Sequence, residues 1–494
     1  MGARKQYRPW NPGQGFLVPP SPHEWLPEND LAYFILDVVE ELDISAIERV
    51  VQRRDPRGTQ PYHPRMMLAL ILYGYCIGVV SSRKVEQATY RDLGFCVIAA
   101  GQHPDHTVIS DFRQRHLEFI RDLFLQTVRL CQEAGLVRLG RVALDGSKVE
   151  ANASKHKAMS YERMLKKEAE LGEEIDELLA RAEQTDQEED TRFGRESRGD
   201  ELPEELQRRQ GRRAKIREAR LALEAEAAQA RASELEEQAA RQRAQAELVD
   251  DPAEQKRAST RAAKAEGKAA ALRGDDDEPP PSSSGDGELP RHRVPATPDG
   301  APKPKAQRNF TDPESRIMKR GQAYLQGYNG QAMVDDAAQV IVATGVTNQA
   351  PDQEHLEPLL ERTKENCGDY PDEALADAGY WSDSNAAYCE AHGVDGYIAT
   401  GRLKHGEEMP PVRGPPPGDL DSKGRMRRKL RTKKGKKVYA RRKAIVEPVF
   451  GQMKEVRGLR RFLLRGLRKV QAEWDLWCAT HNLLKLYRSG WAPT

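Results

Sequence analysis

The chain has 494 residues, and its 78 Lys+Arg nearly balance its 77 Asp+Glu, for a formal net charge of +1. Hydrophobic residues make up 38% and charged residues 31%, with a mean hydropathy of −0.76, so we expect a soluble protein with at least one sizeable core. No apolar run approaches the ~18 residues that a membrane span needs, which predicts no membrane partner. The first residues lack a signal-peptide pattern, and the six cysteines form no CxxC pair. We therefore expect a cytoplasmic protein without a zinc ribbon or a disulfide framework.

Positive charge is concentrated in residues 401–470, which hold 23 Lys+Arg against 6 Asp+Glu. This local surplus of 17 leaves a net charge of −16 for the rest of the chain. The densest part, 423–443, leads into an amphipathic helical pattern. A block this basic is either a solvated tail or a surface for a polyanion, and the helix that follows favours DNA phosphates as the partner.

The N-terminal part predicts an extended arm followed by a helical domain. Residues 1–21 are rich in Gly, Pro and aromatic residues, whereas 22–140 carry apolar residues at i, i+3, i+4 spacing. Two short helices around a glycine-containing turn are compatible with a DNA-binding helix-turn-helix, although many small helical bundles share this pattern. Positions at which helices of the domain could begin are Ser21, Pro64 and Ser110.

A long helical insertion follows a single strand. Residues 141–156 open with the strand pattern RVALDGSKVEA, which then stops. Residues 157–273 are rich in Ala, Glu, Arg, Lys and Gln, and predict a helical hairpin or coiled coil with a break near 193–201. Such an insertion is either a dimerisation element or a solvated decoration. Residues 274–308 have too much Pro, Ser, Gly and charge to fold, and predict a disordered linker.

Strand and helix patterns alternate over 309–488, ahead of a short tail at 489–494. Together with the first strand, the predicted order is β-β-β-α-β-α-β-α, with a basic loop before the last helices. We therefore expect an α/β protein. Its catalytic domain, 141–156 and 309–488, would have an RNase H-like mixed sheet, preceded by an all-α domain and interrupted by a coiled-coil-like insertion. The predicted strands after the insertion are 323–334, 338–347, 373–381 and 395–400, and the helices between them are 355–366 and 382–393.

Three carboxylates fall where this fold would bring them together. Asp145 lies in the first strand, Asp377 ends the fourth, and Glu447 lies on the helix after the last. Each alone has a structural explanation, as a turn residue, a helix cap or a partner of arginine. In combination they predict a site where two divalent cations activate a water or a 3′-hydroxyl and stabilise the leaving oxygen of a phosphodiester. Oxygen ligands favour Mg²⁺, with Mn²⁺ as a substitute.

Four stretches resemble DDE-type insertion-sequence transposases, in particular the IS-eleven-eighty-two group, whose third acid sits in a Tyr–Arg–Glu–Lys signature. The stretches are 62–116, 142–164, 311–335 and 374–454, and the resemblance covers about 60–490 except for 165–300. It implies that Asp145, Asp377 and Glu447 form the catalytic, metal-binding triad. It also implies that Lys454, seven residues after Glu447, contacts a phosphate at the transposon end.

The Tyr and Arg positions of the signature fit less closely. Tyr439 and Arg442 each stand one residue early, while the expected spacing selects Ala440 and Lys443. Either the spacing slips by one residue here or Lys443 replaces the arginine. We therefore expect Tyr439, Arg442 and Lys443 as candidate DNA contacts.

Two further residues are candidates for DNA contacts. Lys148 could approach the scissile phosphate, although an exposed lysine is the simpler explanation. Trp381 could stack on a flipped base, although core packing explains it as well. Other acids and basic residues near the sheet, His156, Asp312, Asp335 and Asp336, are more simply explained as loop, turn or cap residues.

The resemblance thus implies a bacterial, nucleoid-associated DNA transposase. It would bind double-stranded DNA, namely the terminal inverted repeats of its own element and a target, and would act as a homodimer in a synaptic complex. Cleavage and strand transfer would depend on Mg²⁺. Two alternatives stay open: a nuclease of the same fold without strand transfer, and a catalytically inactive, transposase-derived DNA-binding regulator.

Overall fold

The computed structural model describes residues 24–52, 60–193, 204–249, 251–273, 289–401, 412–414 and 417–492, with the backbone alone for 181–193 and 204–205. The arm predicted over 1–21 lies outside these residues. The chain divides into two units, Met1–Thr127 with Ala479–Thr494, and Val128–Cys478.

The first unit is helical, and the C-terminal helix of the chain completes it. The Tyr487 ring packs 5.3 Å from the ring of Phe34, and its hydroxyl donates to the carbonyl of Asn29 at 2.8 Å. The helical domain predicted over 22–140 therefore ends earlier in the chain and includes a distant segment. Its elements are α1 (Leu31–Glu41), α2 (Ser45–Gln52), α3 (Pro64–Ile77), α4 (Ser82–Ala88), α5 (Leu93–Ala99), α6 (His106–Arg115), the start of α7 (Leu117–Glu133) and the end of α15 (Leu467–Ser489).

No single helix in the described ranges is both long and apolar enough to cross a membrane. The bent pair α3 and α4 reaches that length and composition only together, across an angle of 101°.

The second unit is built on a mixed sheet, which has six strands in the described residues. β1 pairs antiparallel with β5 and parallel with β7, and β7 pairs parallel with β8. β6 and β4 each pair antiparallel with a different part of β5. This topology is consistent with an RNase H-like fold. The strands are β1 (Arg141–Glu150), β4 (Arg316–Arg320), β5 (Ala323–Asp335), β6 (Ile341–Thr347), β7 (Glu373–Ala376) and β8 (Asp395–Ile398).

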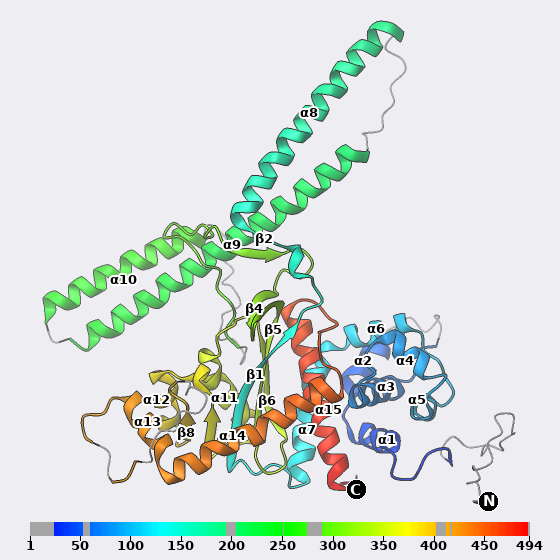
Figure 1. Ribbon diagram of the computed structural model, residues 1–494, viewed down its shortest axis with the longest axis vertical. Helices are drawn as coiled ribbons and strands as arrows, with labels where there is room; N and C mark the ends of the chain where they lie inside the picture. Colours follow the sequence, from blue (N-terminus) through cyan, green and yellow to red (C-terminus); the bar gives the residue numbers. More distant parts are fainter. Residues whose placement is uncertain are drawn as a thin grey trace, which may run out of the picture. The chain divides into compact units, whose positions relative to one another are not determined.

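Helices accompany the sheet, and much of the predicted basic loop is helical. The helices are α11 (Leu356–Cys367), α12 (Asp383–Ala391), α13 (Ser422–Arg431), α14 (Lys433–Gly451) and the first part of α15, with short turns η3 (Gln353–His355), η4 (Ala378–Tyr380) and the π-helical η5 (Gln452–Val456). α14 crosses the sheet in Figure 1 and buries Ile445, Val446 and Val449. On the same helix, the Phe450 ring stacks 6.3 Å from Trp474.

The insertion between β1 and β4 consists of long helices and a two-stranded ribbon. The ribbon pairs β2 (Ala158–Ser160) with β3 (Gln307–Asn309) and follows the short turn η2 (Lys155–Lys157). The helices are α8 (Tyr161–Phe193), α9 (Glu204–Glu247) and α10 (Pro252–Arg273), and α8 and α10 pack along different parts of α9 (Figure 1). The part of the chain for which long helices are predicted after the first strand thus contains two hairpins that share α9.

Residues 289–308 have a defined conformation, which differs from the disordered linker predicted over 274–308. Leu289, Val294 and Ala306 are buried, because the segment packs against the sheet and the insertion. Val294 and Ala306 join the apolar cluster between α8 and α9. Its Pro and Gly residues thus form turns within a packed segment, and the rest of the predicted linker lies outside the described residues.

Candidate active site

Asp145 lies in the middle of β1, directly beside Asp377 on the neighbouring strand path. The parallel register runs to the pair Ala143 and Leu375, and Asp145 and Asp377 each come two residues further on, so that both lie near the same end of this strand pair. Adjacent strands are ~4.8 Å apart, which brings the two carboxylates into one cluster. Burial raises the pKa of Asp145, and the charge of Asp377 adds to this rise while Arg442 opposes it.

Asp377 comes directly after β7 and caps the short turn η4. Its Oδ1 accepts a hydrogen bond from the Gly379 amide at 2.8 Å. The cap fixes the carboxylate at the end of the strand, so that its second oxygen stays available. The sequence prediction of a strand to 381 is too long, because the chain turns here to close η4.

Arg442 and Tyr439 of α14 complete the cluster. Arg442 Nη1 lies 3.1 Å from Asp145 Oδ2, and both side chains are largely withdrawn from solvent, with 11% and 24% exposed. Burial lowers the pKa of Arg442, but the charges of Asp145 and Asp377 outweigh it and raise the pKa overall. Burial raises the pKa of the Tyr439 phenol, which also feels the charges of Arg442 and Asp377. Geometry thus associates Arg442, not Lys443, with the carboxylates.

Lys454 lies on the Asp145 side of β1. Its ammonium contacts the hydroxyl of Ser147, which stands two residues after Asp145 and therefore on the same face of the strand. Burial lowers the pKa of Lys454 from its usual value. Arg442 lies on α14 and Lys454 lies on η5, the π-helical turn that follows directly. One continuous helical segment therefore supplies both cations of the cluster.

Glu447 and Lys443 do not join this cluster in the structure. Both side chains are exposed on α14, and no contact brings Glu447 to Asp145 or Asp377. The structure therefore brings together two of the three predicted acids. Lys148 stands on the opposite face of β1 from Asp145, because successive side chains of a strand alternate. Trp381 is partly buried just after η4.

A polar network that the sequence did not predict lies on the other face of β1. Asp352 Oδ1 accepts hydrogen bonds from Asn329 at 2.7 Å and Gln331 at 2.8 Å. Gln331 in turn contacts the hydroxyl of Tyr380 in η4. The network ties the turn that carries Asp377 to β5. The signal that could have found it is the presence of Asn329 and Gln331 two residues apart, and therefore on the same face, in a buried strand.

The rival acids of the sheet are explained by local structure. Asp335 accepts from the backbone amides of Leu139 and Ala337 at 2.9 and 2.8 Å. Asp336 pairs with Arg141 and Arg441. Asp312 begins the turn that its carbonyl closes with the Ser315 amide at 3.2 Å, as predicted, but its carboxylate is buried and accepts from Tyr328 at 2.8 Å and caps no helix.

The carboxylates fit a hard divalent cation in part. Asp145 and Asp377 supply adjacent oxygen ligands, and Mg²⁺ is commonly held by one or two carboxylates together with waters and substrate phosphates. The raised pKa of Asp145 is the response of a buried carboxylate that a cation would stabilise. Among the described residues no three Asp, Glu, His or Cys side chains gather closely enough to hold a metal by themselves. A metal here would thus depend on substrate oxygens or on a rearranged third acid.

Two family models match the chain. Residues 294–483, which include Asp377 and Glu447, match a model described as "Transposase DDE domain". Residues 20–115, in the first unit, match one described as "Transposase domain (DUF772)". Neither a curated protein nor a solved structure matches the chain. Over these two stretches the chain is similar to transposases, and the later stretch is similar to their DDE domain.

Proposed function

We propose that the protein is the transposase of an IS-eleven-eighty-two-type element, which cleaves the ends of that element and joins them to target DNA. The proposed catalytic residues are Asp145, Asp377 and Glu447. The observation that carries the proposal is the adjacency of Asp145 and Asp377 beside Arg442, inside a sheet whose later part matches a DDE domain.

The proposed reaction is two phosphoryl transfers. In the first, a water oxygen bonds to phosphorus and the bond from phosphorus to the 3′ oxygen breaks, which frees a 3′-hydroxyl. In the second, that hydroxyl attacks a target phosphodiester, and the target's own 3′ oxygen leaves. In each step the proton released by the nucleophile balances the proton taken up by the leaving oxygen.

Residues of the chain would position the phosphate for these steps. Asp145 and Asp377 would hold Mg²⁺, or Mn²⁺ in its place, and the ion supplies activation of the nucleophile and stabilisation of the leaving oxygen. Arg442 and Lys454 place positive charge on the same face of β1, which offsets the charge of the phosphodiester. Tyr439 lines the same cluster. We assign Tyr439, Arg442, Glu447 and Lys454 as the signature residues, with one extra residue between Arg and Glu.

Two further surfaces would hold the DNA. The exposed Lys and Arg side chains of α13 and α14 form a basic helical surface over residues 422–443. In the first unit, α6 presents exposed polar residues and is capped by Asp105, so we propose it as the helix that enters a groove of the inverted repeat. Pairing of two ends requires two copies, and we therefore propose a homodimer in the synaptic complex.

The test is end cleavage by purified protein with Mg²⁺ or Mn²⁺ on labelled duplex DNA that carries the flanking inverted repeat. Wild type should release a 3′-hydroxyl end and, with target DNA, a joined product. Asp145→Asn and Asp377→Asn should each lower cleavage by at least ~10³-fold while binding persists. Asp383→Asn, an exposed acid six residues after Asp377, is the matched control and should cleave normally.

Other outcomes identify the alternatives. Binding without metal-dependent cleavage would mean a regulator derived from a transposase, and cleavage without a joined product would mean a nuclease. Glu447→Gln tests the third acid separately. If cleavage survives this substitution, Glu447 is not part of the catalytic centre.

A further inference from the structure

A basic groove lies at the base of the helical insertion, away from the acidic cluster. It has a volume of about 700 Å³, within the ~300–1,000 Å³ range of ligand sites. Its walls come from β2, β3, the start of α8 and the first part of α9. We call it the insertion groove, and its basic lining residues are His156, Lys157, Arg163, Arg212, Lys215 and Arg308.

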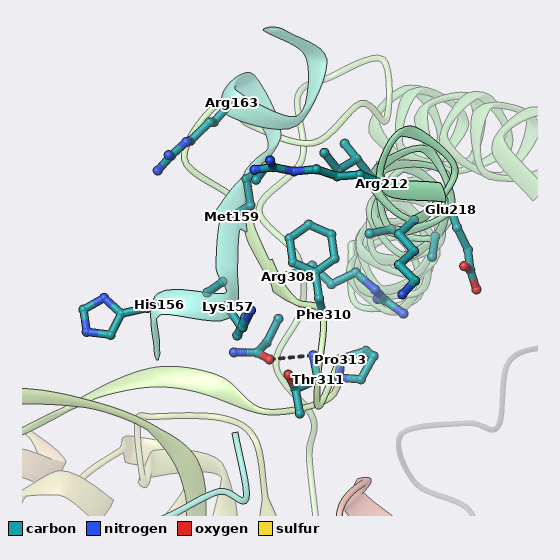
Figure 2. A pocket seen from close by; sticks show the side chains of 16 residues that line it. His156, Lys157, Met159, Arg163, Arg212, Glu218, Arg308, Phe310, Thr311 and Pro313 are labelled. Atoms are coloured by element: carbon teal, nitrogen blue, oxygen red, sulfur yellow. Dashed lines mark hydrogen bonds between the residues drawn. The ribbon is translucent and has the colours of Figure 1, made fainter. Parts of the chain in front are cut away.

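The positive charge of the insertion groove is in excess over nearby acids. Arg308 pairs with Glu226, but Lys157, Arg212 and Lys215 make no ion pair with any carboxylate in the described part of the chain. Glu168 of α8 and Glu224 of α9 both bind Arg220, which is not part of the groove lining. Glu218, the acid in the lining, points away from Phe310 in Figure 2.

The floor of the insertion groove is apolar and fixed. Phe310 packs against the cluster between α8 and α9, together with Met159. Arg212 extends from α9 toward Met159 above this ring (Figure 2). Proteins commonly bind nucleic acids through surfaces that combine cations with an aromatic ring. The cations contact phosphates, and a sugar or base packs against the ring.

A second basic cavity continues the insertion groove toward the sheet. It shares His156 and Lys157 with the groove and adds Arg461 and Arg465, with a volume of about 530 Å³. Its lining reaches Glu150, the last residue of β1 and five residues after Asp145. Five strand residues span roughly 17 Å, which corresponds to about five base pairs of a duplex that rises 3.4 Å per pair.

We propose that the insertion groove binds the sugar–phosphate backbone of the DNA on which the acidic cluster acts, about five or more base pairs from the scissile phosphate. This inference rests on the proposed function and assigns a DNA-binding role to the base of the insertion. The groove then fixes the direction in which the duplex leaves the catalytic centre.

The test compares Arg212→Ala/Lys215→Ala with wild type on a labelled duplex that carries the flanking inverted repeat. Each lost phosphate contact should reduce the magnitude of the slope of log K against log salt by ~0.9. The slope of the double variant should therefore be smaller by ~1.8. Affinity at 0.1 M salt should fall on the order of tenfold for each contact. Arg217→Ala/Lys268→Ala removes two exposed cations of the same insertion outside the groove, and should bind as wild type does.

Two further measurements separate this inference from the proposed function. At saturating DNA, the control variant Arg217→Ala/Lys268→Ala should cleave at the wild-type rate, because Asp145, Asp377 and the groove are all unchanged. On a duplex cut back to fewer than ~5 base pairs on the groove side of the cleavage point, wild type and variant should bind alike.

Equal affinity and equal salt slope for the groove variant and its control on the full duplex would overturn the proposal that the groove binds DNA. So would competition for the groove by inorganic phosphate as strong as by DNA, since that would indicate an anion site only. Failure of the proposed function would look different: wild type would then neither cleave nor join DNA, whatever the state of the groove.

Discussion

The contact between Asp145 and Arg442 joins two partly buried charges that lie 297 residues apart in the sequence. Each charge offsets the other, so that removal of either one leaves its partner buried without compensation. The net contribution of such an ion pair to the free energy of folding is smaller than the cost of removing one partner, because the other charge then stays buried and unpaired. The pair therefore contributes more to the specific geometry of the site than to the overall stability of the unit.

We predict strong coupling between Asp145→Asn and Arg442→Gln in a double-mutant cycle. Each single change should lower the free energy of unfolding, and the double change should cost less than the sum, with a coupling energy of ~1–3 kcal/mol. Urea unfolding followed by tryptophan fluorescence measures the cycle. Additive effects would mean that the two charges do not interact in solution.

We predict that the buried imidazole of His292 makes the folded protein less stable at acidic pH. Burial and the charge of Arg316 lower its pKa to about 4. In the unfolded chain the imidazole takes up a proton near pH 6.5, whereas the folded chain resists protonation until about pH 4. Stability should thus be full above pH 6.5 and fall by ~2 kcal/mol by pH 5.

Thermal unfolding at pH 7 and pH 5 measures this effect. His292→Gln should reduce the difference between the two pH values, while His156→Gln, which replaces an exposed imidazole, should leave it as in wild type. An equal pH dependence in all three proteins would contradict the assignment to His292.

At the scale of elements, two glycines should respond to alanine in opposite directions. A Cβ at Gly327 of β5 would overlap the Val149 carbonyl oxygen of β1 and a methyl of Leu325. The carbonyl belongs to the strand backbone and cannot move alone, so Gly327→Ala should cost on the order of 2 kcal/mol or more. Gly267 of α10 has no atom within 4 Å of such a Cβ, and Gly267→Ala should stabilise its helix by ~0.5–1 kcal/mol.

Two signals monitor these variants separately. Tryptophan fluorescence, to which Trp474 and Trp477 of the sheet unit contribute, should show a lower transition temperature for Gly327→Ala. Circular dichroism at helical wavelengths should show a higher one for the insertion in Gly267→Ala. A neutral Gly327→Ala would mean that β1 and β5 can separate locally without cost.

Sequence patterns predicted the elements whose apolar residues repeat regularly. β1, β5 and β6 follow from alternating or continuous apolar runs. β4 was missed because Arg316 to Arg320 are mostly charged and only Met318 is buried on this edge. The basic stretch was predicted as a loop from its charge, but Asp421 and Thr432 cap α13 and α14 by accepting from the Gly424 and Gly435 amides.

Sequence patterns likewise predicted only part of the candidate site. Asp145 and Asp377 were predictable because both follow apolar strand segments, which a parallel pairing brings together. The choice between Arg442 and Lys443 depends on which side of α14 faces the sheet, which spacing alone did not decide. The Asp352 network was missed because its hydrogen bonds connect residues about twenty or more positions apart. Ser110, a predicted helix start, lies inside α6, since Asp105 caps that helix.

At the scale of the whole molecule, the distal hairpin of the insertion has its own core. Its apolar cluster consists of Ala232, Leu235, Ala239, Ala262, Ala265 and Ala269, all from α9 and α10. No residue of the sheet contributes to this cluster. The hairpin therefore adds little to the stability of the sheet, whatever it binds.

We predict that replacement of residues 236–264 by a short glycine-rich turn shifts the stability of the sheet by less than ~0.5 kcal/mol. Residues 157–273 contain no tryptophan, so the fluorescence of the chain, to which the buried Trp474 and Trp477 contribute, does not include a signal from the hairpin in either protein. A clearly lower fluorescence transition in the shortened protein would show that the hairpin supports the sheet after all.

The last helix of the chain completes both units, and this has a consequence during synthesis. α15 places Trp474 and Trp477 in the core of one unit and Tyr487 in the other. Translation adds roughly 5–20 residues per second, so Asp145 waits roughly 15–60 s for Arg442, and α15 follows later still. A nascent or prematurely terminated chain lacks this helix in both units. Under the proposed function, cleavage therefore requires a chain that already includes α15.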